Sequence, residues 1–501
     1  MTKSKKTRRY IVVVLLLIAV AAVLAGNSPR LWFKAWLADR PVPHFLPPSH
    51  VDDASRLNST QVAEVWPVPG DPAAAEIQLR DLLRRARDER LSVSIAGASH
   101  SMGGHTIAAD GIVLKMLPLN RMELHAESRI LSVGAGARWS EIIPYLDARG
   151  FSVAIMQSNN NFSVGGSISV NCHGWQHNRP PIASTVESLR LMKADGTIVR
   201  CSRDENPKLF SLALGGYGLF GIILDVDLRV VPNERYCPEV EVLPAASYVT
   251  RFFAKVNGAT DVGMVYGRLC VVPGDDTFLR EAILMDFRQA PCKRDEIPAL
   301  RSPGFSSLRR QVYRAQIGSK AGKIARWKAE KLAGEQIHRQ FFSRNQLLNE
   351  AAEIYQERNA DRTDILHEYF IPPQRVAHFL ERARAIIPKH DGELLNVTIR
   401  NVLEDKDVLL RYADQEMFGF VMLFNHARTP VADNQSEAMT RELIDAAIES
   451  GGRYYLPYRL HATTGQFLKA YPQAADFFKL KRHFDPDEIF QNQFYLKYGR
   501  Q

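Results

Sequence analysis

The stretch that most constrains the fold is residues 94–104, which reads S-I-A-G-A-S-H-S-M-G-G. A short apolar run leads into it and predicts a buried strand that ends in a loop of small residues around one imidazole, His100. Gly97, Gly103 and Gly104 permit a positive φ and a close approach of the main chain, so successive N–H groups can form an anion-binding nest. Such a loop suits a pyrophosphate, although glycine and serine also fill ordinary turns.

The chain has 501 residues, which predicts at least two domains. Its formal net charge of +9 is local: residues 1–9 contain five basic residues and no acidic one, and residues 293–344 contain 13 basic against 4 acidic residues. The remainder of the chain is therefore acidic. This distribution favours membrane orientation and contact with a membrane surface, and it argues against nucleic-acid binding.

An apolar run at residues 11–25 follows the basic N-terminus. This pattern predicts either a signal anchor or a cleaved signal peptide in residues 1–25, and the positive-inside rule puts the body of the protein on the non-cytoplasmic side. We expect a membrane anchored protein with a single N-terminal helix or, if the segment is cleaved, an exported one. Residues 26–57 contain two proline clusters and are predicted to be a linker.

Periodicity predicts several elements after the linker. A helix is expected over residues 73–90, where apolar residues recur at helical spacing; they are Ile77, Leu79, Leu82, Leu83 and Ala86. A second glycine-rich stretch covers residues 157–174, and a hairpin with an Asp-Gly turn is expected over residues 186–201. Residues 223–230 alternate with period two, which predicts a strand.

Five cysteines are scattered without the spacing of a zinc site. A metal site or a dense disulfide framework is therefore not expected. One or two disulfides remain possible if the body is exported.

Three stretches together resemble the FAD-binding domain of the vanillyl-alcohol oxidase family, whose members are also called PCMH-type flavoproteins. They are I-A-G-A-S-H-S-M-G-G, F-S-V-G-G-S-I-S-V-N-C-H-G and G-G-Y-G-L-F-G-I-I-L-D-V-D-L-R-V-V. The resemblance implies an α+β protein with a two-part FAD-binding domain at residues 58–234 and an α+β substrate or cap domain at residues 235–452. Residues 453–501 would return to the flavin.

The resemblance also implies which residues hold FAD. The pyrophosphate would lie on residues 97–101, and His100 would carry the flavin covalently on the 8α-methyl group, with His105 as the rival. The positions that match the family's cofactor-binding residues are Gly97, Ala98, Ser99, His100, Ser101, Ser158, Ser163, Gly165, Gly166, Ser169 and Ile222.

The cap domain is similar to that of the sugar-alcohol and aldonolactone oxidase branch. Residues 367–372 and 395–400 are expected to be paired strands, with Arg400 at the arginine of the branch's Glu-x-Arg motif and Thr398 in place of its glutamate. His461 matches a histidine of the closing segment and is the predicted base, and Arg400 would hold negative charge. The basic segment at 293–344 is expected to be helical, either docked on acidic lipids or as a solvated helix face.

Three functions remain open at this point. The first is an FAD-dependent oxidoreductase that oxidises a CH–OH group of a sugar alcohol, aldonolactone or related polyol by hydride transfer to flavin N5, with oxygen or quinone as electron acceptor. The second is a membrane-associated flavin dehydrogenase or reductase that acts on a lipid-linked or sterol-like substrate. The third is a non-catalytic scaffold with a flavin fold.

Overall fold

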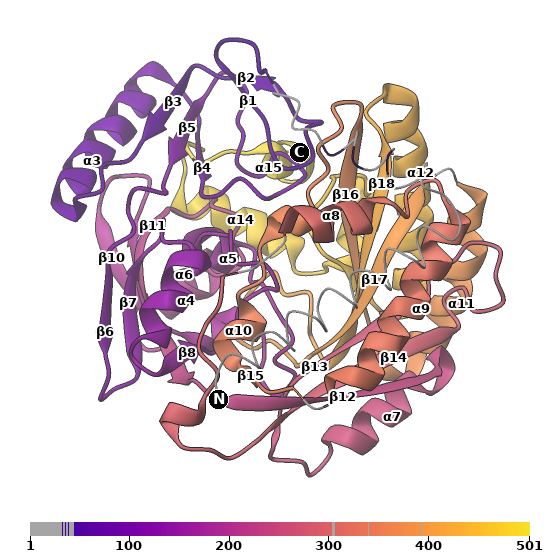
Figure 1. The fold of residues 1–501 in the computed structure, drawn as a ribbon. Coiled ribbons are helices and arrows are strands. Elements are labelled where there is room, and N and C mark those ends of the chain that lie inside the picture. Colours follow the sequence, from indigo (N-terminus) through magenta and orange to yellow (C-terminus); the bar gives the residue numbers. More distant parts are fainter. Residues whose placement is uncertain are drawn as a thin grey trace.

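The computed structural model describes residues 45–302, 306–338, 340–390 and 392–500, together with Phe33, Trp36 and Asp39. The expected N-terminal membrane segment, residues 1–25, lies outside these ranges. Among the residues described, no helix has the length and the apolar character needed to cross a bilayer. Figure 1 shows two large sheets side by side, with the smaller parallel sheet and α3 at the edge of the N-terminal part.

The parallel sheet has the strand order β3-β5-β4 and carries helix α3. Its elements are β3 (Glu64–Pro67), α3 (Pro72–Glu89), β4 (Val93–Ala96) and β5 (Ile112–Lys115), preceded by the short pair β1 (His50–Val51) and β2 (Thr60–Gln61). The Asp71 side chain caps α3 by accepting from Ala74 N, and Pro72 occupies the first turn. Ala75 and Leu79 lie on the buried face of the helix. Ile77 is 59% exposed, so the prediction that it lies on the apolar face is wrong.

The second sheet has the order β10-β9-β11-β7-β6, with β8 paired to β11. Its strands are β6 (Met122–His125), β7 (Ile130–Gly134), β8 (Phe151–Val153), β9 (Val186–Met192), β10 (Ile198–Ser202) and β11 (Ile222–Pro232). The helices of this part are α4 (Trp139–Asp147), α5 (Val164–Ser169) and α6 (Pro207–Ala213). The antiparallel pairing of β9 with β10 confirms the predicted hairpin.

The third sheet has eight strands in the order β15-β12-β14-β13-β17-β18-β16-β19. They are β12 (Arg235–Pro244), β13 (Val262–Leu269), β14 (Glu281–Gln289), β15 (Phe342–Ser343), β16 (Arg362–Ile371), β17 (Glu393–Val402), β18 (Met417–Ala427) and β19 (Arg453–Tyr454). The expected pairing of β16 with β17 is wrong, because β18 lies between them and pairs with both. Its first ten residues are all buried, as a central strand with packing on both faces requires.

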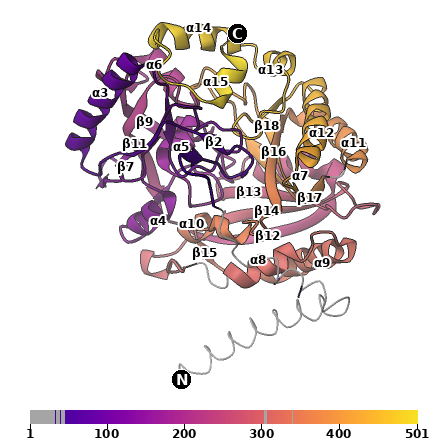
Figure 2. The same cartoon turned by 90° about the horizontal axis from the view of Figure 1, so that it is seen from above.

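Helices cover the third sheet. They are α7 (Tyr248–Val256), α8 (Ser306–Arg314), α9 (Lys320–Ile337), α10 (Arg344–Leu348), α11 (Val376–Ile386) and α12 (Pro430–Glu449). In Figure 2, α9 lies beside β12, whereas α11 and α12 lie together near β16 and β18. The sheet is therefore packed against helices from two different segments of the chain.

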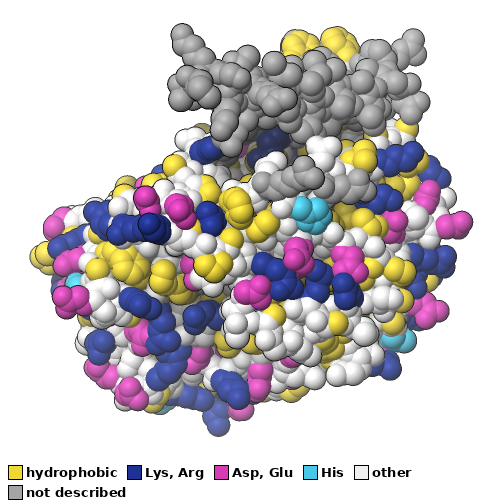
Figure 3. Space-filling model, turned by 60° about the horizontal axis from the view of Figure 1, so that its bottom comes forward, with side chains coloured by type: hydrophobic (Ala, Val, Ile, Leu, Met, Phe, Trp, Pro, Cys, Tyr) yellow, Lys and Arg dark blue, Asp and Glu magenta, His cyan; other side chains and the backbone are white. Residues whose placement is uncertain are grey.

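Part of the basic segment is buried in ion pairs, so the segment is not simply a solvated helix face. Arg310 is buried against Asp39, and Arg314 is buried against Glu357 and Asp364. Lys323 donates to the carbonyl of Leu394 at 2.8 Å. On the face drawn in Figure 3, Lys and Arg side chains are interspersed with Asp and Glu. Much of the segment's positive charge therefore joins α8 and α9 to the rest of the fold.

The C-terminal part contains α13 (Thr464–Ala470), α14 (Ala474–Phe484) and α15 (Gln493–Tyr498). Between α14 and α15, the chain runs alongside β4: Val93 N donates to Ile489 O at 2.7 Å, and Gln491 N donates to Val93 O at 3.0 Å. The end of the chain thereby reaches the strand that leads into the first glycine-rich loop. All five cysteines are free thiols in this fold.

Candidate active site

A cavity of about 490 Å³ is lined both by the glycine-rich loops and by one face of the eight-stranded sheet. This volume is typical of a small-molecule site. The loops supply backbone and small side chains, and the sheet supplies charged and aromatic side chains. The cavity therefore has two walls of different chemistry, which we call the loop wall and the sheet wall.

The first loop of the loop wall starts where two parallel strands end. β4 and β5 pair in parallel with Ala96 opposite Lys115, so the loop and Lys115 share one edge of the sheet. Ser99 and Gly104 have φ values of 55° and 66°, whereas Gly97 and Gly103 do not adopt the positive φ expected for them. Gly97 is needed for space instead, since a Cβ there would lie 2.0 Å from Ser163 Oγ.

The second loop of the loop wall leads into α5. Ser163 caps this helix by accepting from Gly166 N at 3.4 Å, and a Cβ on Gly165 would lie 2.9 Å from that of Ala135. Ten of the predicted cofactor-binding residues line the cavity, and they are Gly97, Ala98, Ser99, His100, Ser101, Ser158, Ser163, Gly165, Gly166 and Ser169. Ile222 does not line it but is fully buried in a core cluster, while Gly221 and Ile223 line the cavity.

The two histidines of the first loop differ in their surroundings. The His100 ring stacks on Phe162 with 4.3 Å between ring centroids, and burial lowers its pKa, so it is neutral near pH 7. The His105 ring lies 5.5 Å from that of Tyr217 and 5.8 Å from that of Phe494, and burial lowers its pKa to about 3. Both rings line the cavity.

The loop wall fits a pyrophosphate group. Ser101 Oγ is buried without a hydrogen-bond partner among the described residues, which leaves a donor for a ligand. Lys115 Nζ donates to Ser99 Oγ at 3.3 Å and brings a cation to the loop. Because the glycines lack Cβ atoms, the main chain is also open to close approach. The sequence reasoning missed Lys115, which only the parallel pairing of β4 and β5 brings to this edge.

The sheet wall follows from the two-residue period of its strands. Alternate residues of four neighbouring strands line the cavity; they are Tyr266 and Arg268 on β13, Asn396, Thr398 and Arg400 on β17, Val421 and Leu423 on β18, and Leu366 and Glu368 on β16. On the other face of β16, His367 contacts Thr440 of α12, and Tyr369 contacts Phe379 of α11.

Arg400 connects the two walls. One guanidinium nitrogen donates to Ser158 Oγ at 2.7 Å, and the other donates to the His173 carbonyl at 3.3 Å. Its Nε is buried and has no partner among the described residues. Two residues away, Thr398 accepts from Arg268 at 3.1 Å, and Arg268 contacts Glu330 of α9 at 3.4 Å. Where the Glu-x-Arg motif has a glutamate, this chain therefore has the hydroxyl of Thr398, which is hydrogen-bonded to Arg268.

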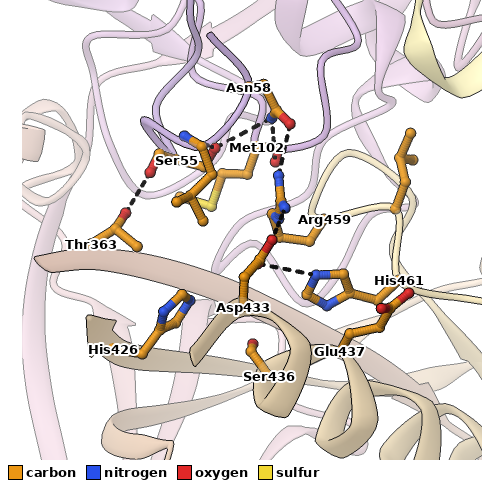
Figure 4. A network of polar contacts seen from close by, with 12 residues as sticks. Ser55, Asn58, Met102, Thr363, His426, Asp433, Ser436, Glu437, Arg459 and His461 are labelled. Carbon is orange, nitrogen blue, oxygen red and sulfur yellow. Dashed lines mark hydrogen bonds and ion pairs between the residues drawn. The ribbon is translucent and has the colours of Figure 1, made fainter. Parts of the chain in front are cut away.

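His461 lies outside the cavity lining, in the polar network of Figure 4. Its Nδ1 is 3.0 Å from Thr440 Oγ1, and its Nε2 is 3.6 Å from Asp433 Oδ1. Asp433 also accepts from Arg459, which in turn donates to Asn58. The network joins α12 and the C-terminal segment to the start of the described chain, so we do not assign the base function to His461.

Three cavity residues were missed by the sequence reasoning, although all stand in stretches that it quoted. His173 Nε2 is 2.7 Å from Glu368 Oε1, and Glu368 Oε2 accepts from the Tyr458 hydroxyl at 3.2 Å. These residues are far apart in the sequence, so no spacing indicates that they meet. Tyr458 and Pro457 line the cavity, three and four residues before His461.

Comparison with known proteins agrees with the chemistry of the loop wall. Residues 73–202 match the profile of a family described as an FAD binding domain. A segment of 157 residues, 31% of this chain, is 31% identical to L-gulonolactone oxidase of Mus musculus and covers 36% of that protein. A segment of 188 residues is 31% identical to D-arabinono-1,4-lactone oxidase of Yarrowia lipolytica, covering 36% of each chain.

A longer match, 326 residues at 26% identity, is to cytokinin dehydrogenase 2 of Oryza sativa subsp. japonica and covers 62% of this chain and 54% of that one. The chain spans about a third of the length of the lactone oxidases that it matches. The predicted resemblance to PCMH-type flavoproteins is confirmed, and FAD is the cofactor of residues 73–202.

Proposed function

We propose, from the FAD-binding domain in residues 73–202, that this protein is an oxidoreductase that oxidises a CH–OH group of a sugar lactone or a related polyol. The observation that carries this proposal is that Arg400 of the sheet wall and Ser158 of the loop wall meet in one cavity. The names of the lactone oxidase relatives support the substrate class.

The residues that would hold FAD belong to the loop wall. The main chain of residues 97–101 would bind the pyrophosphate together with Ser101 Oγ and Lys115. His100 is our candidate for covalent attachment, because its ring is neutral near pH 7 and lines the cavity. When bound, FAD supplies a two-electron acceptor that takes a hydride from the substrate carbon.

Arg400 would stabilise negative charge near the reacting carbon. Its guanidinium contacts a hydroxyl and a carbonyl rather than a carboxylate, so its charge is not neutralised by these partners. A cation that is already oriented at the reacting centre stabilises a developing alkoxide more than water does, because it need not reorient during the reaction. Ser158 and the His173 carbonyl would hold the guanidinium in position for that role.

The decisive experiment uses the full chain, purified in detergent. We would record the visible spectrum, precipitate the protein with acid, and test wild type and His100→Ala for flavin fluorescence in the pellet. Fluorescence that stays in the wild-type pellet and is released from His100→Ala supports covalent attachment. Colourless protein that cannot be reconstituted with FAD would overturn the function.

Substrate and acceptor are tested on the same preparation. Anaerobic bleaching of the flavin by L-gulono-1,4-lactone or D-arabinono-1,4-lactone, with no bleaching by a steroid alcohol, supports the lactone proposal. Reoxidation by air with formation of hydrogen peroxide identifies an oxidase, and reoxidation by a quinone alone identifies a dehydrogenase.

The N-terminal anchor is also part of the proposal, and its support is the basic and apolar sequence of residues 1–25. The body of the protein would lie on the non-cytoplasmic side. Membrane fractionation, followed by protease treatment of intact cells or spheroplasts, tests this topology. Protein that stays protected from the protease would contradict it.

A further inference from the structure

We propose that the substrate carries an anionic group, a carboxylate or a phosphate, and that Arg268 and Thr398 bind this group on the sheet wall. The anion site rests on the function proposed above and narrows its substrate to an acidic member of the lactone and polyol class. Both residues line the cavity, and they lie opposite each other on the neighbouring strands β13 and β17. Arg268 Nη1 donates to Thr398 Oγ1 at 3.1 Å.

The Thr398 hydroxyl is left with only its hydrogen for a ligand. Its oxygen accepts from Arg268 and from Asn396 Nδ2, each at 3.1 Å, which occupies both lone pairs. The Asn396 amide is oriented by Arg326, a donor only, which contacts Asn396 Oδ1 at 3.3 Å and so turns the NH₂ group toward Thr398. None of the described residues accepts the Thr398 hydrogen. The hydroxyl can therefore donate to an acceptor in the cavity.

Arg268 also keeps donors and positive charge for a ligand. A guanidinium has five N–H groups, and the described partners of Arg268 are Thr398 and, at 3.4 Å, Glu330. Glu330 does not cancel its charge, because Arg326 contacts the same carboxylate at 2.8 Å. Two arginines and one glutamate leave a net formal charge of +1. A planar guanidinium recognises both carboxylate and phosphate groups.

The direction of hydrogen bonding at residue 398 favours an anion. The Glu-x-Arg motif has a glutamate at this position, and an ionised carboxylate only accepts hydrogen bonds. Thr398 and Arg268 both offer donors instead. Because one negative charge is also missing, an acceptor that brings its own negative charge suits this place better than a neutral hydroxyl.

The carboxylates of the cavity leave room for such an anion. Among the described residues, the charged side chains that line the cavity are three arginines and two glutamates. Glu350 is paired with Arg309 at 3.3 Å. Glu368 is on β16, three strands from Arg268 across the sheet, which corresponds to about 14 Å between the backbones. Neither glutamate therefore places an unpaired charge beside Arg268.

Arg400 indicates how far the anion would lie from the reacting carbon. Thr398 and Arg400 are two residues apart on one face of β17, about 7 Å along the strand. An anionic group at Thr398 would lie several carbon atoms from a CH–OH group beside Arg400. This separation fits a sugar acid or a sugar phosphate better than a 2-hydroxy acid, whose two groups are on adjacent carbon atoms.

Binding is tested on the full chain loaded with FAD, with three compounds of one carbon skeleton. D-Glucitol is neutral, D-gluconate has a carboxylate, and D-glucitol 6-phosphate has a phosphate. In isothermal titration calorimetry at least one of the acids should bind about 10-fold or more tightly than D-glucitol. Preference for D-gluconate identifies a carboxylate site, and preference for the phosphate identifies a phosphate site. Equal affinities for all three compounds would overturn the proposal.

Arg268→Met should remove this preference. The preferred acid should bind roughly 10- to 100-fold more weakly, because the anion loses its cation, whereas the affinity for D-glucitol should change little. Glu330 keeps Arg326 as a partner in this variant. The control is Arg251→Met on α7, whose side chain is 48% exposed and does not line the cavity. An unchanged preference in Arg268→Met would refute the anion site.

Two substitutions of Thr398 separate recognition from support of the fold. Thr398→Val removes the donor and should weaken binding of the acid about 3- to 10-fold. Thr398→Glu adds a carboxylate that would pair with Arg268 and repel an anion, so D-glucitol should then bind more tightly than the acids. A purely structural role would weaken all three compounds alike. Acids that remain preferred in Thr398→Glu would overturn the proposal.

Anaerobic reduction of the flavin distinguishes the anion site from the proposed function. The preferred acid should reduce the flavin faster than D-glucitol does. If D-glucitol or L-gulono-1,4-lactone reduces the flavin and the acids bind no more tightly, the proposed function stands and the anion site fails. If an acid binds through Arg268 but no compound reduces the flavin, the anion site stands and the proposed function fails.

Discussion

The two walls of the cavity are built in different ways. The loop wall uses main chain and small side chains from two short stretches, residues 97–101 and 163–166, whose glycines leave no room for a Cβ. The sheet wall uses large side chains from four strands that are joined only by the third sheet. The loop wall suits a ligand that approaches its backbone closely. The sheet wall contacts a ligand through the chemistry of its side chains.

This difference predicts different responses to mutation. A larger side chain in the loop wall should affect whether FAD binds, because it takes up the space that FAD needs. A change in the sheet wall should leave FAD bound and alter the reaction or the stability of the cap. Four substitutions test this division.

The largest expected effect is on the support of the sheet wall. Arg314 of α8 is buried, with 5% of its side chain exposed, and pairs with Asp364 at the start of β16, the strand that carries Glu368. Arg314→Met leaves a buried carboxylate without its partner and should lower the free energy of unfolding by about 3–5 kcal/mol. Urea denaturation measures it, with Lys328→Met, an exposed site of α9, as the control. Equal losses in the two variants would refute the internal role of the basic segment.

Next in size is the loss of the cavity's guanidinium. Arg400→Met should lower kcat/KM for the oxidised lactone by about 100- to 1,000-fold, because a fixed charge at the reacting centre is removed. The ratio of flavin to protein should not change. The control is Arg382→Met on α11, whose side chain is 47% exposed. A loss of flavin from Arg400→Met would contradict the division between the walls.

A smaller effect is expected from one methyl group in the loop wall. In Gly97→Ala the added Cβ would lie 2.0 Å from Ser163 Oγ, so the two loops must separate. This should weaken FAD affinity by about 10- to 100-fold, which is measured by fluorescence titration in a His100→Ala background to keep FAD non-covalent. In the control, Gly465→Ala, the nearest atom lies 4.0 Å away. Unchanged affinity in Gly97→Ala would show that FAD does not depend on this close approach.

The last prediction concerns the pH dependence of stability, which tests the burial of the loop wall's second histidine rather than the binding of FAD. His105 has a pKa of about 3 in the folded protein, below its unfolded value of about 6.5, so the unfolded chain binds the extra proton as the pH falls. Its contribution to stability is present above pH 6.5 and is lost as the pH falls toward 3. His105→Phe should reduce the slope of unfolding free energy between pH 6 and pH 4 by about 1.4 kcal/mol per pH unit.

Urea denaturation at several pH values measures this slope. The control is His125→Gln, because the His125 side chain is exposed on β6. If His105→Phe retains the wild-type slope, the assignment of His105 as a buried, neutral side chain is wrong.

The basic segment shows where sequence reasoning fails. A run of basic residues predicts contact with lipid or with solvent, and these were the two alternatives for residues 293–344. In the structure, Arg310 and Arg314 are buried in ion pairs, and their acidic partners Asp39, Glu357 and Asp364 lie in other parts of the sequence. Local charge counts cannot reveal such pairs, since the compensating charge belongs to another segment.

The residues of the loop wall were implied by the resemblance to PCMH-type flavoproteins, and that resemblance could be recognised because the motifs that carry it are local. Space for the main chain depends on glycine at particular positions, and a strand that leads into a loop shows in the pattern of apolar residues. Ten of eleven predicted cofactor-binding residues line the cavity. Ile222 is the exception: its neighbours line the cavity, whereas its own side chain packs in the core.

The sequence by itself therefore determined the strands, the hairpin, the glycine-rich loops and the cofactor that they fit. Only the tertiary structure decided that β18 separates β16 from β17, that His461 lies outside the cavity, and that His173 meets Glu368. The physical reason is that backbone space and side-chain period are set by neighbours along the chain. Partners on the sheet wall are set by strand order, which depends on how the whole apolar surface is buried.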